Sequence, residues 1–189
     1  LWNNYFFQTT GFPDYPKISV WPDAYYITTN ETNAAGTVLT PAVYALDRTN
    51  MLTGAAAAPM QRFVGPGSAG LNFQAYSPAD MEGATAPGAG SNAYFMRQND
   101  DELNSPGTAN PTSDTLELWQ LHTDFTTPAN SAFSLLTTIT VADFDADFNR
   151  PQGGFGSIPQ PNGQLLDPIK TTVVHGQRAM STWVVRKSG

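Results

Sequence analysis

Alternation of apolar and polar residues marks the start of the chain as β-structure. Between residues 17 and 21 the pattern puts Ile18 and Val20 on one face of an extended strand. Pro22-Asp23 then suits the centre of a tight turn, because proline presets φ at the second turn position. Residues 25–29 are aromatic and β-branched, which favours another strand. The segment therefore predicts a hairpin.

The same kind of pattern recurs further along the chain. Strands are predicted at 41–47, 60–64, 72–77, 92–97, 115–125 and 132–141, with a short helical turn that Gly54 ends. Two groups of four strands follow one another and align in part. Tyr25 matches Tyr94 at an offset of 69, and Tyr44 matches Trp119 at an offset of 75. A third group begins near residue 165.

Repeated four-stranded units are typical of the blades of a β-propeller. The units cover residues 12–64, 71–142 and 165–189, and the last is truncated. A propeller usually needs at least about four blades. We therefore expect residues 1–189 to be a single all-β domain or part of one, built as an incomplete propeller. The chain would then be either a fragment or one of several chains that together close a ring. The alternative is one β-sandwich in which the repeat is a coincidence.

Composition narrows the classes of function. Hydrophobic residues make up 40% of the chain and charged residues 13%, as in a folded globular protein. The net charge of −7 and the scattered basic residues argue against nucleic acid as a partner. Without cysteine there are no disulfides or thiolate zinc sites, and no apolar run reaches the length of about 18 residues that a membrane helix needs. Low charge and a non-methionine start predict a processed, secreted or cell-surface protein.

Several segments resemble a family of secreted bacterial proteins whose blades are similar to those of sialidase-type propellers. The resemblance rests on "FPDYPKISVWPDAYYITTN", "YALDRTNMLTG", "SPADMEGATAPGAGSNAYF", "DFTTPANSAFS" and "RAMSTWVVRKSG". It implies a propeller-like fold and export, but no particular reaction. Members of that family often carry cysteines and continue beyond the segment that matches "RKSG", and this chain does neither.

Three aspartates, Asp14, Asp80 and Asp167, each precede a pair of predicted strands. Equivalent positions of propeller blades converge, so these carboxylates could form a negative mouth for a cation or a polyhydroxylated ligand. Alternatively, each one caps a turn through backbone N–H groups. A sialidase-type site would also need clustered arginines to bind a carboxylate, and Arg178 is a candidate together with Arg48 and Arg97.

A second acidic segment is a candidate calcium site. The oxygen ligands that calcium prefers recur at alternate positions in "DFDADFN", at Asp143, Asp145, Asp147 and Asn149. The EF-hand pattern fails, because Phe148 stands at the glycine position. The alternative is a solvated acidic loop.

Evidence for catalysis is thin in the sequence. There is no G-x-S-x-G motif, and the imidazole bases are His122, near Asp124, and His175. Gly65, Gly67 and Gly70 match the pattern G-x-G-x-x-G, but no helix is predicted after them to bind an anion, so they predict a loop between blades. Five aromatic residues lie on or next to predicted strands: Trp21, Tyr25, Tyr26, Trp119 and Trp183. Exposed rings of this kind could stack on sugars, although packing in the core is the stronger interpretation. The glycosylation sequon at Asn30 predicts a surface loop.

Two functions remain open from the sequence. The first is a non-catalytic binding and assembly protein whose ligand is carbohydrate or another protein chain. The second is a glycan-active hydrolase with carboxylates and arginines drawn from several blades. The first is preferred because no catalytic set is evident.

Overall fold

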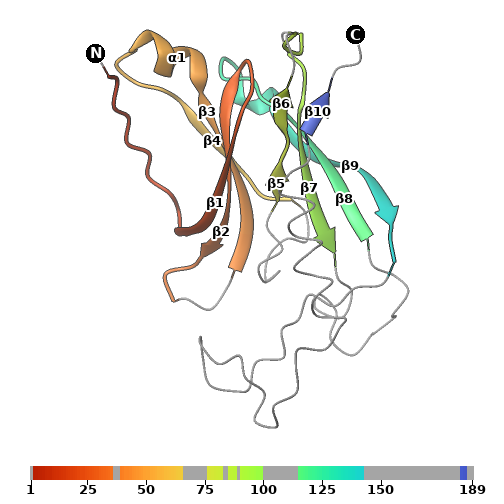
Figure 1. Ribbon diagram of the computed structural model, residues 1–189. Coiled ribbons are helices and arrows are strands. Elements are labelled where there is room, and N and C mark those ends of the chain that lie inside the picture. Colours follow the sequence, from red (N-terminus) through yellow and green to blue (C-terminus); the bar gives the residue numbers. More distant parts are fainter. Residues whose placement is uncertain are drawn as a thin grey trace, which may run out of the picture.

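The structure is a computed structural model that describes residues 2–35, 39–65, 76–82, 85–88, 90–99, 115–142 and 184–186. Two four-stranded antiparallel sheets dominate it (Figure 1). The first sheet has the order β1-β2-β3-β4, formed by Phe12–Val20, Ala24–Thr32, Leu39–Asp47 and Met60–Phe63. Each strand pairs with the next along the chain, so this sheet is a simple up-and-down meander.

The second sheet repeats this arrangement with one interruption. Its order is β5-β7-β8-β9, formed by Ser77–Pro78, Ala93–Asn99, Thr115–His122 and Ala132–Thr140. Between its first two strands, β6 (Asp80–Glu82) leaves the sheet and pairs in parallel with β10 (Val184–Arg186). A 3-10 turn at Pro128–Asn130 lies in the β8–β9 connection.

The hydrophobic core lies between the two sheets, which face each other (Figure 1). Both sheets contribute aromatic rings: Tyr26 of β2 packs edge-on against Phe95 of β7, with ring centroids 5.7 Å apart. The buried residues of this core are Trp21, Ala24, Tyr26, Val43, Ala45, Tyr76, Ala79, Ala93, Phe95, Trp119 and Leu121. The all-β prediction is confirmed, and two packed sheets agree with the sandwich alternative.

Polar side chains also join the sheets. The indole Nε1 of Trp21 donates to the carbonyl oxygen of Ala79 at 3.0 Å. The Tyr26 hydroxyl lies 2.8 Å from Asp23 Oδ2 and 3.0 Å from Thr123 Oγ1, at the end of β8. Because buried polar atoms without partners are costly, these bonds fix how the sheets align.

The predicted first hairpin is confirmed. The backbone N–H of Trp21 donates to the carbonyl of Ala24 at 3.0 Å and closes the turn. Ser19 and Trp21 face inward, with 2% and 1% exposure, whereas Ile18 is 65% exposed on the outer face of this edge strand. The prediction of a surface loop at Asn30 was wrong, because Asn30 lies in β2 with 1% exposure.

The predicted helical turn is present as α1 (Arg48–Thr53), which connects β3 to β4. The Asp47 carboxylate caps its start by accepting from the backbone N–H of Asn50 at 3.0 Å. Gly54 ends it in the left-handed region at φ 71°, which glycine adopts without strain.

The strand pairing corrects the repeat inferred from sequence. Tyr25 lies opposite Leu46, and its match Tyr94 lies opposite Gln120. Tyr94 follows Tyr25 by 69 residues, and its partner Gln120 follows Leu46, the partner of Tyr25, by 74 residues. Matching Tyr44 to Trp119 instead gives 75. Side chains alternate between faces, so one residue of slip exchanges inside and outside. The two sequence offsets cannot both hold.

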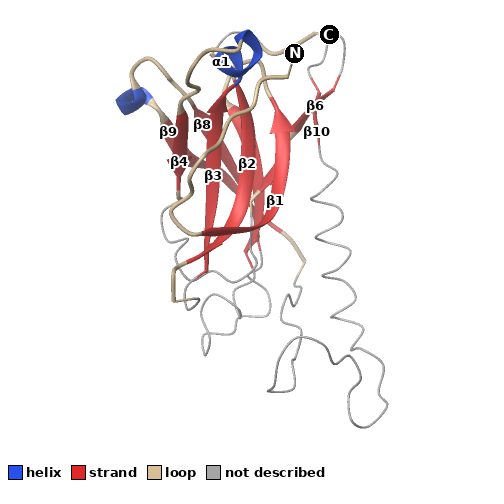
Figure 2. Cartoon of the chain, turned by 90° about the vertical axis from the view of Figure 1, so that its left-hand side faces the viewer, coloured by secondary structure: helices blue, strands red, loops and turns tan. Residues whose placement is uncertain are grey.

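Residues 2–11 cross the outer face of the first sheet before β1 begins (Figure 2). The Tyr5 hydroxyl is 2.8 Å from the Ala55 carbonyl, and Asn3 Nδ2 donates to the Met51 carbonyl at 3.2 Å. Gly11 lies so close to β2 that a Cβ would overlap the Thr32 carbonyl. On the far side of this segment, Trp2 and Phe6 are 95% and 99% exposed. Among the described residues, no helix has the length and apolar character to cross a membrane.

Candidate functional site

Two of the aspartates predicted to bind a ligand lie in the described strands. Asp14 Oδ1 accepts from the backbone N–H of Tyr15 at 2.8 Å, at the point where the β1–β2 register shifts. Asp80 Oδ1 accepts from the backbone N–H of Met81 at 3.0 Å in β6. Both carboxylates are exposed. Each therefore makes a local backbone contact of the kind expected for a turn-forming aspartate.

The other predicted site residues lie outside the described residues. These are Asp167 and Arg178 of the proposed mouth, and the candidate calcium ligands Asp143, Asp145, Asp147 and Asn149. Within the described ranges, no three carboxylate or imidazole groups gather as a metal site would require. Both sets stay predictions.

Two arginines considered for a glycan carboxylate bind within the protein. Arg97 is buried, and its Nε and Nη2 donate to Glu117 Oε2 at 3.0 and 2.6 Å. Its guanidinium also lies over the Tyr76 and Trp119 rings, 5.5 and 5.7 Å from their centroids. Arg48 Nη1 donates to the Pro22 carbonyl at 3.3 Å. Arg97 is therefore a core residue.

Asp124, which follows β8, organises the connection to β9. Its Oδ1 accepts from the backbone N–H groups of Thr127 and Thr126 at 2.8 and 2.9 Å, and its Oδ2 from Asn130 Nδ2 at 3.0 Å. These hydrogen bonds hold the pKa of Asp124 below its usual range, and the bond from the Thr127 backbone N–H has the largest effect. Asp47, the last residue of β3, anchors the next connection in a similar way, because its carboxylate accepts hydrogen bonds from the backbone N–H and the side-chain amide of Asn50.

The core interpretation is confirmed for three of the strand aromatics, whereas Tyr25 is half-buried outside the core, with the Arg48 guanidinium 5.9 Å from its ring centroid. Trp21, Tyr26 and Trp119 are 1%, 0% and 3% exposed. Glycine at position 65 also allows this close packing, because a Cβ there would overlap the Tyr76 hydroxyl and the Trp119 ring. None of these buried rings offers a face to a sugar. Trp183 lies outside the described residues.

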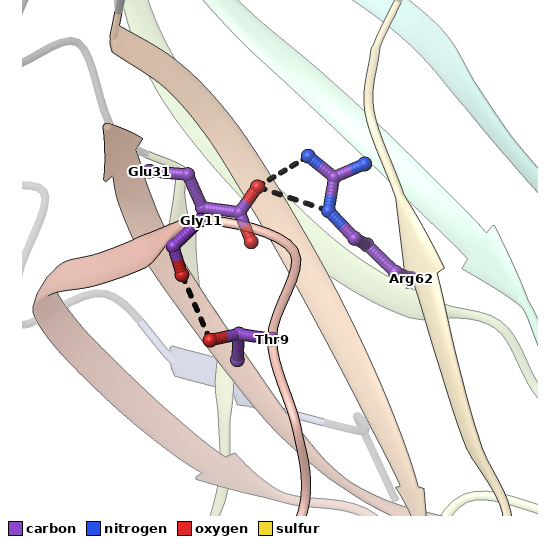
Figure 3. A network of polar contacts seen from close by, with 4 residues as sticks. All are labelled: Thr9, Gly11, Glu31 and Arg62. Atoms are coloured by element: carbon purple, nitrogen blue, oxygen red, sulfur yellow. Dashed lines mark hydrogen bonds and ion pairs between the residues drawn. The ribbon is translucent and has the colours of Figure 1, made fainter. Parts of the chain in front are cut away.

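The two four-stranded sheets have four edges among the described strands, β1, β4, β5 and β9, and three of these edges are protected. β1 carries Pro13, Pro16, Lys17 and a register shift, while β5 has only two residues, one of them proline. β4 has four residues, and its Arg62 is joined to Glu31 of β2 (Figure 3). Short strands, prolines, charges and bulges are the usual devices that stop an edge from pairing with another chain.

The fourth edge, β9, has little such protection. It runs for nine residues, "AFSLLTTIT", without proline or charge. Among the described strands it pairs only with β8, and every residue except Phe133 is exposed. Three large aliphatic side chains are 45–47% exposed along it: Leu135, Leu136 and Ile139. One protective feature remains, since Leu136 is an extra residue between the partners of Leu118 and Trp119.

Beyond this bulge the β8–β9 register is regular through Thr137–Thr140. In this segment alternate backbone N–H and C=O groups point away from β8, toward the open side of the sheet. The arrangement can accept an extended strand through backbone hydrogen bonds. We take β9 as the candidate functional site.

The sequence predicts this strand but not its place at an edge. An exposed edge depends on which strands pair, and pairing is not visible in one strand's own residues. The absence of charge over 132–140 was the available signal. Comparison with family models, curated proteins and solved structures gave no match.

Proposed function

We propose that this chain is a secreted or cell-surface binding and assembly protein without catalytic activity, and that its partner is another protein chain. One observation carries the proposal: among the described strands β9 pairs only with β8, and its nine residues have no charge or proline and carry three exposed aliphatic side chains. Strand addition to such an edge is a recurrent mode of protein recognition, in which backbone hydrogen bonds supply affinity and side chains supply specificity.

We also propose that the two sheets are consecutive blades of an incomplete propeller. In support, each sheet is a meander in chain order, and β2 and β7 run in the same direction (Figure 1). β1 lies in contact with β5, the first strand of the other sheet. Immunoglobulin-type sandwiches instead cross between their sheets by Greek-key connections. In a blade the last strand lies outermost, which would leave β9 accessible.

Carbohydrate as the ligand has less support. Sugar-binding surfaces use exposed aromatic rings. Trp21, Tyr26 and Trp119, which were candidates for this role, are buried, and the exposed strand aromatics Phe12 and Tyr15 lie on the proline-containing β1 edge. The glycan-hydrolase alternative needs arginines at a solvent-facing site, and Arg97 is engaged with Glu117.

The test uses a short peptide of alternating threonine and valine with lysine at each end, added to isotope-labelled protein. We expect NMR shift changes concentrated on β9, above all on Thr137–Thr140. Ile139→Lys should abolish them, because it puts a charge on the edge at a side chain that is 45% exposed. Val64→Lys, beside the β4 edge at a residue 37% exposed, is the matched control and should leave them unchanged. Shift changes elsewhere, or none at millimolar peptide, would contradict the proposal.

A further inference from the structure

We propose that the strand added at β9 is β9 of a second copy of this chain, so that two molecules form one continuous eight-stranded sheet across a two-fold axis. This inference rests on the proposed role of β9 as a binding edge and names its partner. Such an interface is isologous: the same strand is presented by both copies.

Charge favours self-pairing at this edge. In a two-fold antiparallel pair every residue near the axis lies opposite itself or a near neighbour, so any charge there meets a like charge. The chain has a net charge of −7, yet Ala132–Thr140 contains no charged residue. The β1 edge, by contrast, would bring Lys17 or Asp14 of the two copies close together. Like charges directly opposite each other destabilise strand pairs.

Symmetry and the pleat restrict the register. A two-fold axis normal to the sheet keeps the same face of both copies on the same side. Side chains alternate between faces along a strand, so two residues that lie opposite each other must differ in residue number by an even number. In the regular segment after the bulge, this places Thr138 opposite its own copy and Thr137 opposite Ile139 of the copy. Pairs of β-branched residues favour pleated structure.

The exposed aliphatic side chains supply the apolar area of this contact. Ile139 lies opposite Leu116 of β8 and is 45% exposed, and Leu136 is 47% exposed at the bulge. A single strand pair buries less than the area of about 1,200 Å² that stable interfaces reach. We therefore expect a weak dimer that dissociates on dilution.

The experiment is analytical ultracentrifugation of the full chain at low salt, from micromolar to millimolar concentration. We expect the wild type to dimerise as concentration rises. Thr138→Lys and Thr138→Glu should each raise the dissociation constant at least about tenfold. Mixing these two variants should restore the dimer, because opposite charges then face each other on the axis. Thr138→Val and the exposed-residue control Thr10→Lys should dimerise like the wild type.

Thermal unfolding of each variant establishes that it is folded. A wild type that stays monomeric at millimolar concentration overturns the inference, as does a dimer that Thr138→Lys leaves intact. If the chain is monomeric but the threonine–valine peptide still binds β9, the binding role stands and the partner is a different protein. If the peptide also fails to bind, both proposals fall.

Discussion

The buried ion pair of Arg97 and Glu117 allows a quantitative test of the second sheet. The two side chains are 5% and 10% exposed. Glu117 Oε2 accepts three hydrogen bonds, two from Arg97 and one from the Trp119 indole Nε1 at 2.8 Å. One carboxylate oxygen therefore holds the guanidinium and the ring in place together.

Removing either charge alone should be costly. Glu117→Gln keeps the shape but leaves the Arg97 cation buried without this carboxylate, and Arg97→Met leaves the carboxylate without the cation. Breaking one partner of a buried pair costs about 3–5 kcal/mol. The double variant buries neither charge, and its glutamine oxygen still accepts from Trp119. We therefore expect the double variant to lose less stability than either single variant.

The assay is urea unfolding followed by tryptophan fluorescence, with all four members of the double-mutant cycle. Arg62→Met is the comparison for a more exposed pair, since the Arg62 side chain is 31% exposed, and it should cost less than Arg97→Met. Losses that simply add, with coupling below about 0.5 kcal/mol, would refute the reasoning.

Four further predictions each concern a single residue. Tyr26→Phe should cost about 1–2 kcal/mol at neutral pH, because it removes the hydrogen bond to Asp23 within the first hairpin and the contact with Thr123 between the sheets. Burial, and then the Asp23 charge, raise the pKa of Tyr26. The stabilisation that the protonated Tyr26 hydroxyl provides therefore decreases as pH rises above about 10. In urea unfolding, the free energy of unfolding should fall less steeply with rising alkaline pH for Tyr26→Phe than for the wild type. Asp124→Asn should lower the melting temperature at neutral pH, with a difference that shrinks as pH falls through the lowered Asp124 pKa. Gly65→Ala should cost about 1–3 kcal/mol in the same unfolding assay, because its Cβ meets buried rings. Asp145→Asn should weaken calcium binding in titration calorimetry if the acidic segment holds the ion, and an unchanged isotherm would remove that site.

The strands were predictable because their pattern is local. The first hairpin, the turn of α1 and the strands 92–97 and 132–141 follow from alternation, β-branched residues and the glycine stop. The relation between the two strand groups was less accessible. Matching Tyr44 to Trp119 gave an offset one residue too large, because similarity of residue type does not determine which face a side chain occupies.

The candidate site was harder to predict than the fold. Asp14 and Asp80 are exposed and each accepts a hydrogen bond from the next backbone N–H, and their role in binding a ligand stays a prediction. The sequence did not identify β9 as a site because the strand has no charged residue. The lack of charge points to strand pairing only when the strand is known to lie at the edge of its sheet.

The last strands of the two sheets, β4 and β9, can be compared directly. β4 and β9 are both the last strand of a four-stranded meander, so both need to pair with only one neighbouring strand of their sheet. β4 does so with four residues and an ion pair between Arg62 and Glu31. β9 uses nine residues with no charge. Since the first sheet forms without a long uncharged last strand, the length and composition of β9 are not needed to complete a sheet. The proposed pairing with another strand would account for both its length and its lack of charge.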